Sequence, residues 1–266
     1  MDFAAFRAQC AAIAGAGDLS TFRQEREIRT IVDNVPEAVG EMYAAAAQRI
    51  FGDAWTRLAS RIAEIDRVGS PPQPLDLGEW GADVALSPEF VRYAFRALEL
   101  DAFLGLRGRR VVEIGGGYGG LAAVADRLVG SIFSWTIVDI AEASALQARY
   151  LSDVMAYSVS TDAAAQRYAI DAAPVDLVVS DYALSEVGES EMEGYVPLLR
   201  RASVGAVIWN EGGGMSTEDG AAWLREATGR ILFRLGDPHA TVLGLEGLEG
   251  EHLAGRMYWG SGREAS

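Results

Sequence analysis

Residues 111–120, VVEIGGGYGG, place an acid, Glu113, before five glycines that fall within residues 115–120. Three of these glycines match the spacing G-x-G-x-x-G, between a run typical of a strand and a run typical of a helix. A backbone without Cβ atoms, next to the positive end of a helix, allows a ligand to lie directly against it. Asp139 ends the next apolar run, where a carboxylate can accept hydrogen bonds from two ribose hydroxyls. These residues predict a binding site for a ligand that contains a nucleoside.

Two classes of cofactor use this arrangement, and Glu113 helps to separate them. A dinucleotide-binding strand usually carries an apolar residue at this position, whereas an acid suits the amino group of a ligand with an amino-acid end. Only one α/β domain follows the glycines, which leaves no room for a second mononucleotide-binding half and a substrate domain. We therefore expect S-adenosylmethionine and not a nicotinamide or flavin cofactor. The alternative, a tight turn that binds nothing, is disfavoured because five glycines exceed what a turn needs.

The elements that would position these residues alternate along the chain from residue 109. Short β-rich runs are followed by helical runs, and this alternation predicts a mostly parallel sheet with helices on both faces. The strands are expected at 110–114, 134–140, 154–159, 175–180 and 206–210, with a short helix around 163–168 and another near 190–202. The last two strands, 230–235 and 254–260, have no helical run between them, so we expect them to pair antiparallel. The predicted fold is therefore α/β, a Rossmann-like, mostly parallel seven-stranded sheet with a terminal antiparallel hairpin, the sheet type of class I methyltransferases.

The residues before this domain read as helices. Thr21 with Gln24 resembles a capping box that opens one helix, and Pro36 suits the first turn of the next. We divide the chain into a helical N-terminal region, residues 1–105, and an S-adenosylmethionine-binding domain, residues 106–266. Within the first region, the stretch Pro71–Arg92 is expected to close over the acceptor, and residues 1–60 are expected to form a homodimer interface.

Composition limits the partners and the compartment. A formal charge of −15 argues against nucleic acid and anionic membranes as partners. The single cysteine, Cys10, is expected to be a buried thiol and fits a reducing compartment. The first residues lack the pattern of a signal peptide, and no apolar run is long enough to span a bilayer. We expect a cytoplasmic protein that acts on a small molecule.

From about residue 64 the chain resembles the sugar O-methyltransferases, a family of class I S-adenosylmethionine-dependent enzymes. The resemblance rests on EIGGGYGGLA (113–122), IVDIAEASALQARYL (137–151), DYALSE (181–186) and GAVIWN (205–210), and on the terminal YWG. The sequence departs from the family where Asp181 replaces an expected asparagine and where NEGGGMS (210–216) is richer in glycine. Together with the motifs above, the resemblance implies that the cofactor contacts are made by Glu113, Gly115, Gly116, Gly117, Tyr118, Gly119, Asp139, Ile140, Asp181 and Tyr182.

Transfer of a methyl group to a hydroxyl needs alignment and a group that takes the hydroxyl proton. Such a base should lie at the carboxyl ends of the fourth and fifth strands or in the last loop, and we predict Glu186 and His239 as the catalytic residues, with Asp181 and Glu211 as further candidates. No adjacent acids occur there, which favours catalysis without a metal. Arg92 is expected to bind an anionic group of acceptor or cofactor.

The predicted reaction is O-methylation of a sugar or a sugar-like small molecule. Methylation of a small molecule at nitrogen or at a non-sugar oxygen is an alternative that the sequence does not separate from it. A third alternative is a catalytically silent protein that binds the cofactor and acts through its helical region. The intact acid, glycines and second acid argue against the silent protein.

Overall fold

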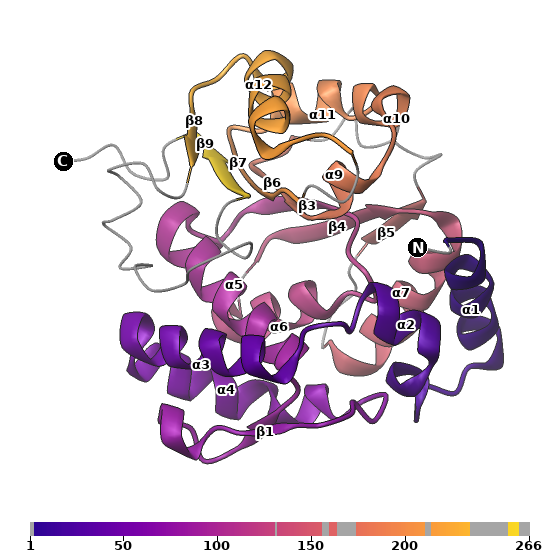
Figure 1. The fold of residues 1–266 in the computed structure, drawn as a ribbon, viewed down its shortest axis with the longest axis vertical. Coiled ribbons are helices and arrows are strands. Elements are labelled where there is room, and N and C mark those ends of the chain that lie inside the picture. The colour runs from indigo at the N-terminus through magenta and orange to yellow at the C-terminus, as the bar shows by residue number, and fades with distance from the viewer. Residues whose placement is uncertain are drawn as a thin grey trace.

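The computed structural model describes residues 3–130, 132–155, 160–163, 174–210, 214–234 and 255–260. Within these residues the main sheet has seven strands in the order β5-β4-β3-β6-β7-β9-β8 (Figure 1). The strands are β3 Arg110–Ile114, β4 Ser134–Asp139, β5 Ser160–Ala163, β6 Leu177–Asp181, β7 Val204–Ile208, β8 Leu232–Arg234 and β9 Arg256–Trp259.

The chain enters this sheet at its centre. It runs from β3 outward through β4 to β5, and then returns to β6 on the other side of β3, each pairing being parallel. Ligands of open α/β sheets bind at such a reversal, outside the carboxyl ends of the strands. The topology therefore places the ends of β3, β4 and β6 around one site.

The antiparallel pairing predicted for the last two strands is confirmed. β9 pairs antiparallel with β8 and also with β7, so the sheet is mixed, with five parallel strands extended at one edge by the pair. The strand expected at 154–159 is wrong in position: α7 (Ala141–Val154) continues to Val154, and β5 begins at Ser160. The short helix expected around 163–168 lies outside the described residues.

Side chains that alternate along the central strand enter two different cores. Val111 packs with the helices that lie before and directly after β3 in the chain, whereas Val112 and Ile114 pack on the opposite face with the helices that follow β6 and β7. Because alternate residues of a strand face opposite sides, Glu113 lies on the face of Val111. The acid therefore points toward the layer that contains the N-terminal helices.

The second layer contains α9 (Ala183–Glu186), α10 (Glu189–Glu193), α11 (Val196–Arg201) and α12 (Thr217–Thr228). The single helix expected near 190–202 is wrong, since α10 and α11 are separate. Pro197 lies in the first turn of α11. A proline has no N–H to donate and cannot continue a preceding helix, which accounts for the break.

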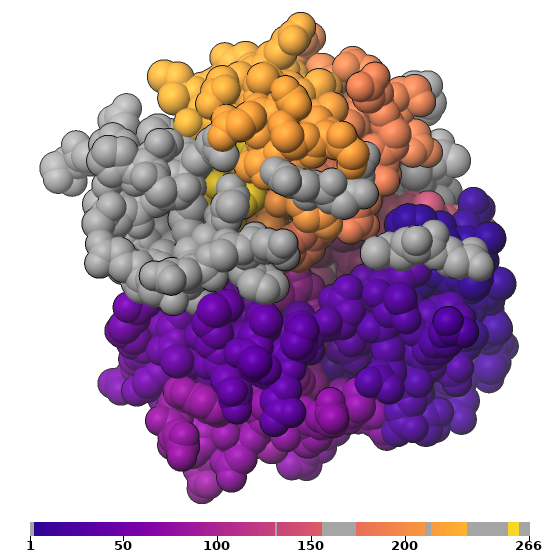
Figure 2. Space-filling model, viewed as in Figure 1, coloured from indigo at the N-terminus to yellow at the C-terminus, as the bar shows by residue number. Residues whose placement is uncertain are grey.

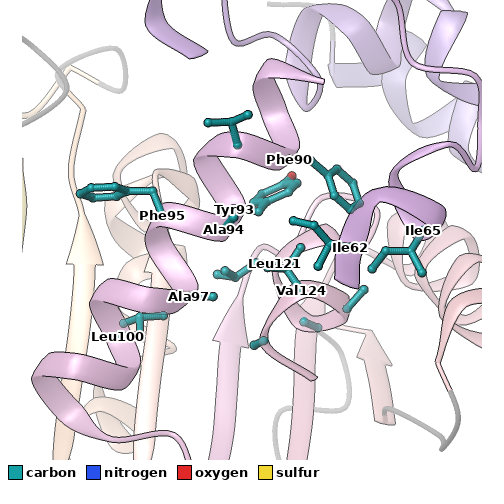
Figure 3. Packing of buried hydrophobic residues seen from close by; sticks show 14 of the residues in the cluster. Ile62, Ile65, Phe90, Tyr93, Ala94, Phe95, Ala97, Leu100, Leu121 and Val124 are labelled. Atoms are coloured by element: carbon teal, nitrogen blue, oxygen red, sulfur yellow. The ribbon is translucent and has the colours of Figure 1, made fainter. Parts of the chain in front are cut away.

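The first layer contains the N-terminal helices together with α6 and α7. Its elements are α1 (Phe3–Ala16), η1 (Phe22–Gln24), α2 (Arg26–Ile31), α3 (Glu37–Phe51), α4 (Asp53–Asp66), α5 (Pro88–Leu104) and α6 (Gly120–Val129). Helix α5 lies at its centre and packs between α4 and α6 through Phe90, Tyr93, Ala94, Ala97, Leu100, Ile62, Ile65, Leu121 and Val124 (Figure 3). This helix joins the N-terminal part to the cofactor loop.

The N-terminal part contains two sequence patterns typical of a capped helix start, and only one of them caps a helix in the structure. Ser87 caps α5 by accepting a hydrogen bond from the Phe90 N–H at 3.3 Å. The capping box predicted at Thr21 and Gln24 is wrong, because the Thr21 side chain makes no cap hydrogen bond and the chain forms the short η1 there. Between α4 and α5 the chain forms η2 (Gly78–Trp80) and the antiparallel pair of β1 (Leu75–Asp76) and β2 (Ala85–Leu86).

Most of the aromatic side chains of residues 1–60, the segment predicted to form a dimer interface, are buried within the chain itself, whereas Phe3 is 44 % exposed. Phe6, Phe22, Tyr43 and Trp55 are all 5 % exposed or less, and Cys10 is fully buried. Burial raises the pKa of the Cys10 thiol to about 12. The physical reason for expecting a dimer is therefore removed, and the oligomeric state stays a prediction. No helix among the described residues has the length and apolar character needed to cross a membrane.

Candidate functional site

A cavity of about 470 Å³ lies at the carboxyl ends of β3, β4, β6 and β7. Its polar wall comes from the strand ends and the turns that follow them, namely Glu113, Gly115, Gly116, Gly117, Asp139, Asp181, Tyr182, Glu186 and Asn210. Its other wall is largely apolar and comes from N-terminal residues that we call the cover: Phe3, Phe6, Ile31, Val32, Asn34, Val35, Pro36 and Val39. In Figure 2 the N-terminal residues, in indigo, face the orange C-terminal half of the molecule.

Glu113 is a buried acid at the bottom of this cavity. Its side chain is 3 % exposed, and Oε2 accepts a hydrogen bond from Trp135 Nε1 at 2.8 Å. Burial raises the pKa of Glu113 to about 8, although the bond from Trp135 favours the charged form. A carboxyl held in this way needs a cationic partner to ionise at neutral pH.

The glycine loop lines the cavity with backbone, but its closest neighbours belong to the chain. A Cβ at Gly115 would meet that of Ala183 at 2.0 Å, and one at Gly117 would meet Cγ1 of Val32 at 2.6 Å. Both glycines also have positive φ angles, +72° and +56°. The glycines thus allow close packing of α9 and the cover around the loop, in addition to any contact with a ligand.

Asp139 ends β4 at the same cavity. Its Oδ2 accepts hydrogen bonds from the Gly116 N–H at 3.1 Å and from Gln147 Nε2 at 2.7 Å, and its Oδ1 accepts one from the Ile140 N–H at 2.8 Å. Burial raises the pKa of Asp139 to about 6 despite these donors. The carboxylate is therefore fixed in orientation, and the second lone pair of Oδ1 remains for a ligand hydroxyl.

Asp181 ends β6, Tyr182 follows it, and both line the cavity. Asp181 is held by Arg96, whose Nη2 lies 2.8 Å from Oδ1. Tyr182 has φ +71° and ψ −39°, a conformation that costs about 1–3 kcal/mol for a residue with a side chain. The Tyr182 N–H donates to the Ile208 carbonyl at 2.8 Å, which helps to hold this strained turn in place.

Glu186, a predicted catalytic residue, lies at the cavity at the end of α9, the short helix after β6. Its Oε1 accepts a hydrogen bond from Asn210 Nδ2 at 2.9 Å, which fixes one oxygen and leaves Oε2 to meet a substrate. Asn210 had been noted only as the end of a motif. The other candidates for a base, His239 and Glu211, lie outside the described residues.

Three residues predicted to contact the cofactor do not line the cavity. Tyr118 is fully buried, with its ring centroid 5.1 Å from that of Tyr150 and 5.3 Å from that of Phe22. Gly119 caps the start of α6, and Ile140 precedes α7. These three support the loop from behind, and the structure brings the other seven predicted cofactor residues together at the cavity.

The cover is held to the rest of the protein by a buried arginine. Arg23 donates from Nε and Nη2 to the two carboxylate oxygens of Asp33, both at 2.9 Å. It also donates to Asp66 Oδ1 and Ser87 Oγ, both at 2.7 Å. The Arg23 side chain is fully buried, so the four groups fix the cover against the ends of α4 and α5. Of the stretch Pro71–Arg92, predicted to be the lid, only Arg92 lines the cavity, and the closing movement stays a prediction.

The cavity is acidic overall. Four carboxylates line it, from Glu113, Asp139, Asp181 and Glu186, against the single guanidinium of Arg92. Among the residues that the structure describes, no three His, Cys, Asp or Glu side chains are grouped so that they could hold a metal ion. A positively charged group of a ligand would be attracted to these acids and would favour ionisation of Glu113.

Comparison with known proteins gives weak similarities. No family model matches the chain, and no curated protein matches it. Among solved structures, the apo form of the S-adenosylmethionine-dependent methyltransferase SibL is 16 % identical, with a TM-score of 0.45, and covers 89 % of this chain and 73 % of its own. Cofactor-bound Rv0187 from MTB is 18 % identical, with a TM-score of 0.42. The match covers 87 % of this chain and 99 % of the Rv0187 chain. These values are too low to assign a function, which we base on the residues of the site.

Proposed function

We propose that the protein binds S-adenosylmethionine and transfers its methyl group to a small molecule. The observation that carries this proposal is the buried Glu113 carboxyl beside the backbone of Gly115–Gly117, in a cavity with an excess of carboxylates. S-Adenosylmethionine carries an ammonium and a sulfonium, and both are attracted to this wall. Asp139, at the end of the next strand, is positioned for the ribose hydroxyls.

A dinucleotide fits the same wall poorly. Its pyrophosphate carries two negative charges and would have to lie on the glycine backbone, next to Asp139, which is mostly ionised at pH 7 because its pKa is about 6. Like charges placed together in a buried site repel strongly because the local dielectric is low. The charge of Asp139, and that of Glu113 when a cationic group of the ligand ionises it, therefore favour the sulfonium ligand over NAD or FAD.

When bound, S-adenosylmethionine supplies an electrophilic methyl group. The residues of the chain would align the acceptor and take its proton, and Glu186 is the proposed base because Oε2 is free of the bond that Asn210 makes to Oε1. The cover forms one wall of the cavity and so reduces the access of water to it. This reduction strengthens the electrostatic interactions within the site.

The residues of the cover also indicate which kind of acceptor molecule fits the cavity. Phe3, Phe6, Ile31, Val35 and Val39 give it an apolar inner face. A free sugar offers mainly hydroxyls to such a face, whereas a larger natural product offers rings or chains as well. We propose an acceptor with an apolar face and a hydroxyl that reaches Glu186. A sugar attached to an apolar molecule satisfies both requirements.

The test is transfer of a methyl group from isotopically labelled S-adenosylmethionine to a panel of sugars, glycosides and aromatic alcohols. Mass spectrometry measures the gain in mass of each acceptor. We expect a gain of one methyl on at least one acceptor with an apolar part. Glu186→Gln should lower kcat for that acceptor by about 100-fold or more, the usual contribution of a positioned base, with the affinity for S-adenosylhomocysteine unchanged. Binding of the cofactor product with no transfer to any acceptor would favour a silent binding protein.

A further inference from the structure

Arg92 is a cation in a cavity that is otherwise acidic. It lies on α5, its side chain is 11 % exposed, and it lines the cavity together with Glu113. Its guanidinium carbon is 5.0 Å from the ring centroid of Tyr93 and 5.3 Å from that of Tyr182. The two aromatic rings hold the guanidinium in place by cation–π contacts.

The guanidinium of Arg92 is only partly used by the protein. Its Nε donates to Glu89 Oε1 at 3.0 Å, and its Nη2 donates to the same oxygen. Two donors on one oxygen do not form the parallel two-oxygen pair that is strongest for arginine and carboxylate. Glu89 Oε2 is buried and has no hydrogen-bond partner.

Arg96, one helical turn further along α5, provides a comparison. Its guanidinium donates to Asp181 through Nε and Nη2, and to Glu99 through Nη1 at 2.8 Å. Arg96 is buried and does not line the cavity. The two arginines thus differ in role: Arg96 is enclosed in a network of its own chain, whereas Arg92 faces the space for the ligand.

We propose that Arg92 binds the carboxylate of the ligand's amino-acid end, while Glu113 binds its ammonium. Amino and carboxylate groups on one carbon require a cation and an anion in the same part of a site, and Arg92 and Glu113 line the same cavity. The charge of Arg92 acts on Glu113, since it lowers the pKa of that acid against the larger raising effect of burial. This inference rests on the proposed function and assigns the residue that selects for a complete amino acid.

The test compares two ligands that share the nucleoside. S-Adenosylhomocysteine has the amino-acid end, and 5′-methylthioadenosine lacks it. For Arg92→Met we expect calorimetry to give an affinity for S-adenosylhomocysteine that is lower by about 10–100-fold, as for the loss of a hydrogen bond to a charged group. The affinity for 5′-methylthioadenosine should change by less than about threefold, because this ligand lacks the carboxylate that Arg92 is proposed to bind and its other contacts are independent of Arg92.

Two further variants keep the result interpretable. Arg110→Met removes a more exposed arginine that pairs with Asp176 at the start of β3, and should leave both affinities unchanged. Arg92→Lys keeps the charge without the planar donor set, and should show the same selective loss in smaller degree even if Arg92→Met does not fold. Equal losses for both ligands, or no loss for either, would overturn the assignment. Wild-type protein that binds neither ligand would instead contradict the proposed function.

Discussion

The titration of Glu113 gives a prediction whose size follows from the structure. With a pKa of about 8, only about 1 % of the Glu113 side chains are ionised at pH 6 and about 9 % at pH 7 in the ligand-free protein. If the ligand ammonium requires the carboxylate, the apparent affinity is the intrinsic affinity multiplied by this fraction. The affinity for S-adenosylhomocysteine should therefore rise by about tenfold from pH 6 to pH 7. Asp139, with a pKa of about 6, adds a smaller rise in the same direction.

Calorimetry in two buffers of different ionisation enthalpy measures the accompanying proton release. We expect close to one proton released per ligand at pH 7 from Glu113. Glu113→Gln, whose amide oxygen can still accept from Trp135 Nε1, should bind more weakly and lose most of the pH dependence. Glu189→Gln, at an exposed position of α10, is the matched control and should keep the wild-type profile. An affinity that is flat from pH 6 to pH 7 in the wild type would refute the role of Glu113.

The same substitution has a predicted effect on stability. The pKa of Glu113 is higher in the folded chain than in the unfolded chain, because burial disfavours the carboxylate. The stability that this group contributes is fully present below its unfolded pKa, near 4.5, and is lost as the pH rises toward 8. The melting temperature of Glu113→Gln relative to wild type should therefore increase between pH 5 and pH 8. A difference that is constant over this range would mean that the acid is not buried.

Four other outcomes follow from the geometry. Asp139→Ala should weaken S-adenosylhomocysteine and 5′-methylthioadenosine equally, by about 1.5–3 kcal/mol, because both contain the ribose; a loss for only one would exclude ribose binding. Arg23→Met leaves two buried carboxylates without their cation and should lower the urea unfolding free energy by about 3–5 kcal/mol, whereas a loss below about 1 kcal/mol would contradict its role in holding the cover. Gly117→Ala should lower the melting temperature more than Gly130→Ala, since both have positive φ but only the first meets the cover; equal losses would mean that the cover yields freely. Deletion of residues 1–60 should prevent cooperative unfolding, because side chains from this segment belong to the main hydrophobic core. The predicted dimer is tested separately by light scattering of the full chain.

Most of the cofactor wall could be predicted from sequence because its signals are local. Glu113, the glycines and Asp139 lie at strand ends, and their spacing along the chain already places them at one edge of a parallel sheet. The supporting residues were harder to find. Trp135 reaches Glu113 from the neighbouring strand at the start of β4, and nothing in its sequence context indicates that contact. Tyr118 was misplaced because a tyrosine inside a glycine loop can face the ligand or the core.

The cover could not be predicted for a related reason. An amphipathic helix shows which of its faces is apolar, but not which surface that face will meet. Residues 1–60 were therefore predicted to meet a second copy of the chain, whereas Phe6 and Tyr43 in this segment are buried within one copy. Nothing in the sequence distinguishes Arg23 from other basic residues. Only the fold brings Asp33 and Asp66 close enough to accept hydrogen bonds from its buried guanidinium. The division of the chain at residue 105 stays a prediction, although one hydrophobic core includes side chains from both sides of it.

The most direct test of the central claim is a calorimetric titration of the purified full-length protein at pH 7.5 with S-adenosylhomocysteine and, separately, with NAD. The charge of the cavity predicts saturable one-to-one binding of S-adenosylhomocysteine in the micromolar range or tighter, about −8 kcal/mol or more, and no measurable binding of NAD. Saturable binding of NAD, or no heat with S-adenosylhomocysteine, would contradict the account.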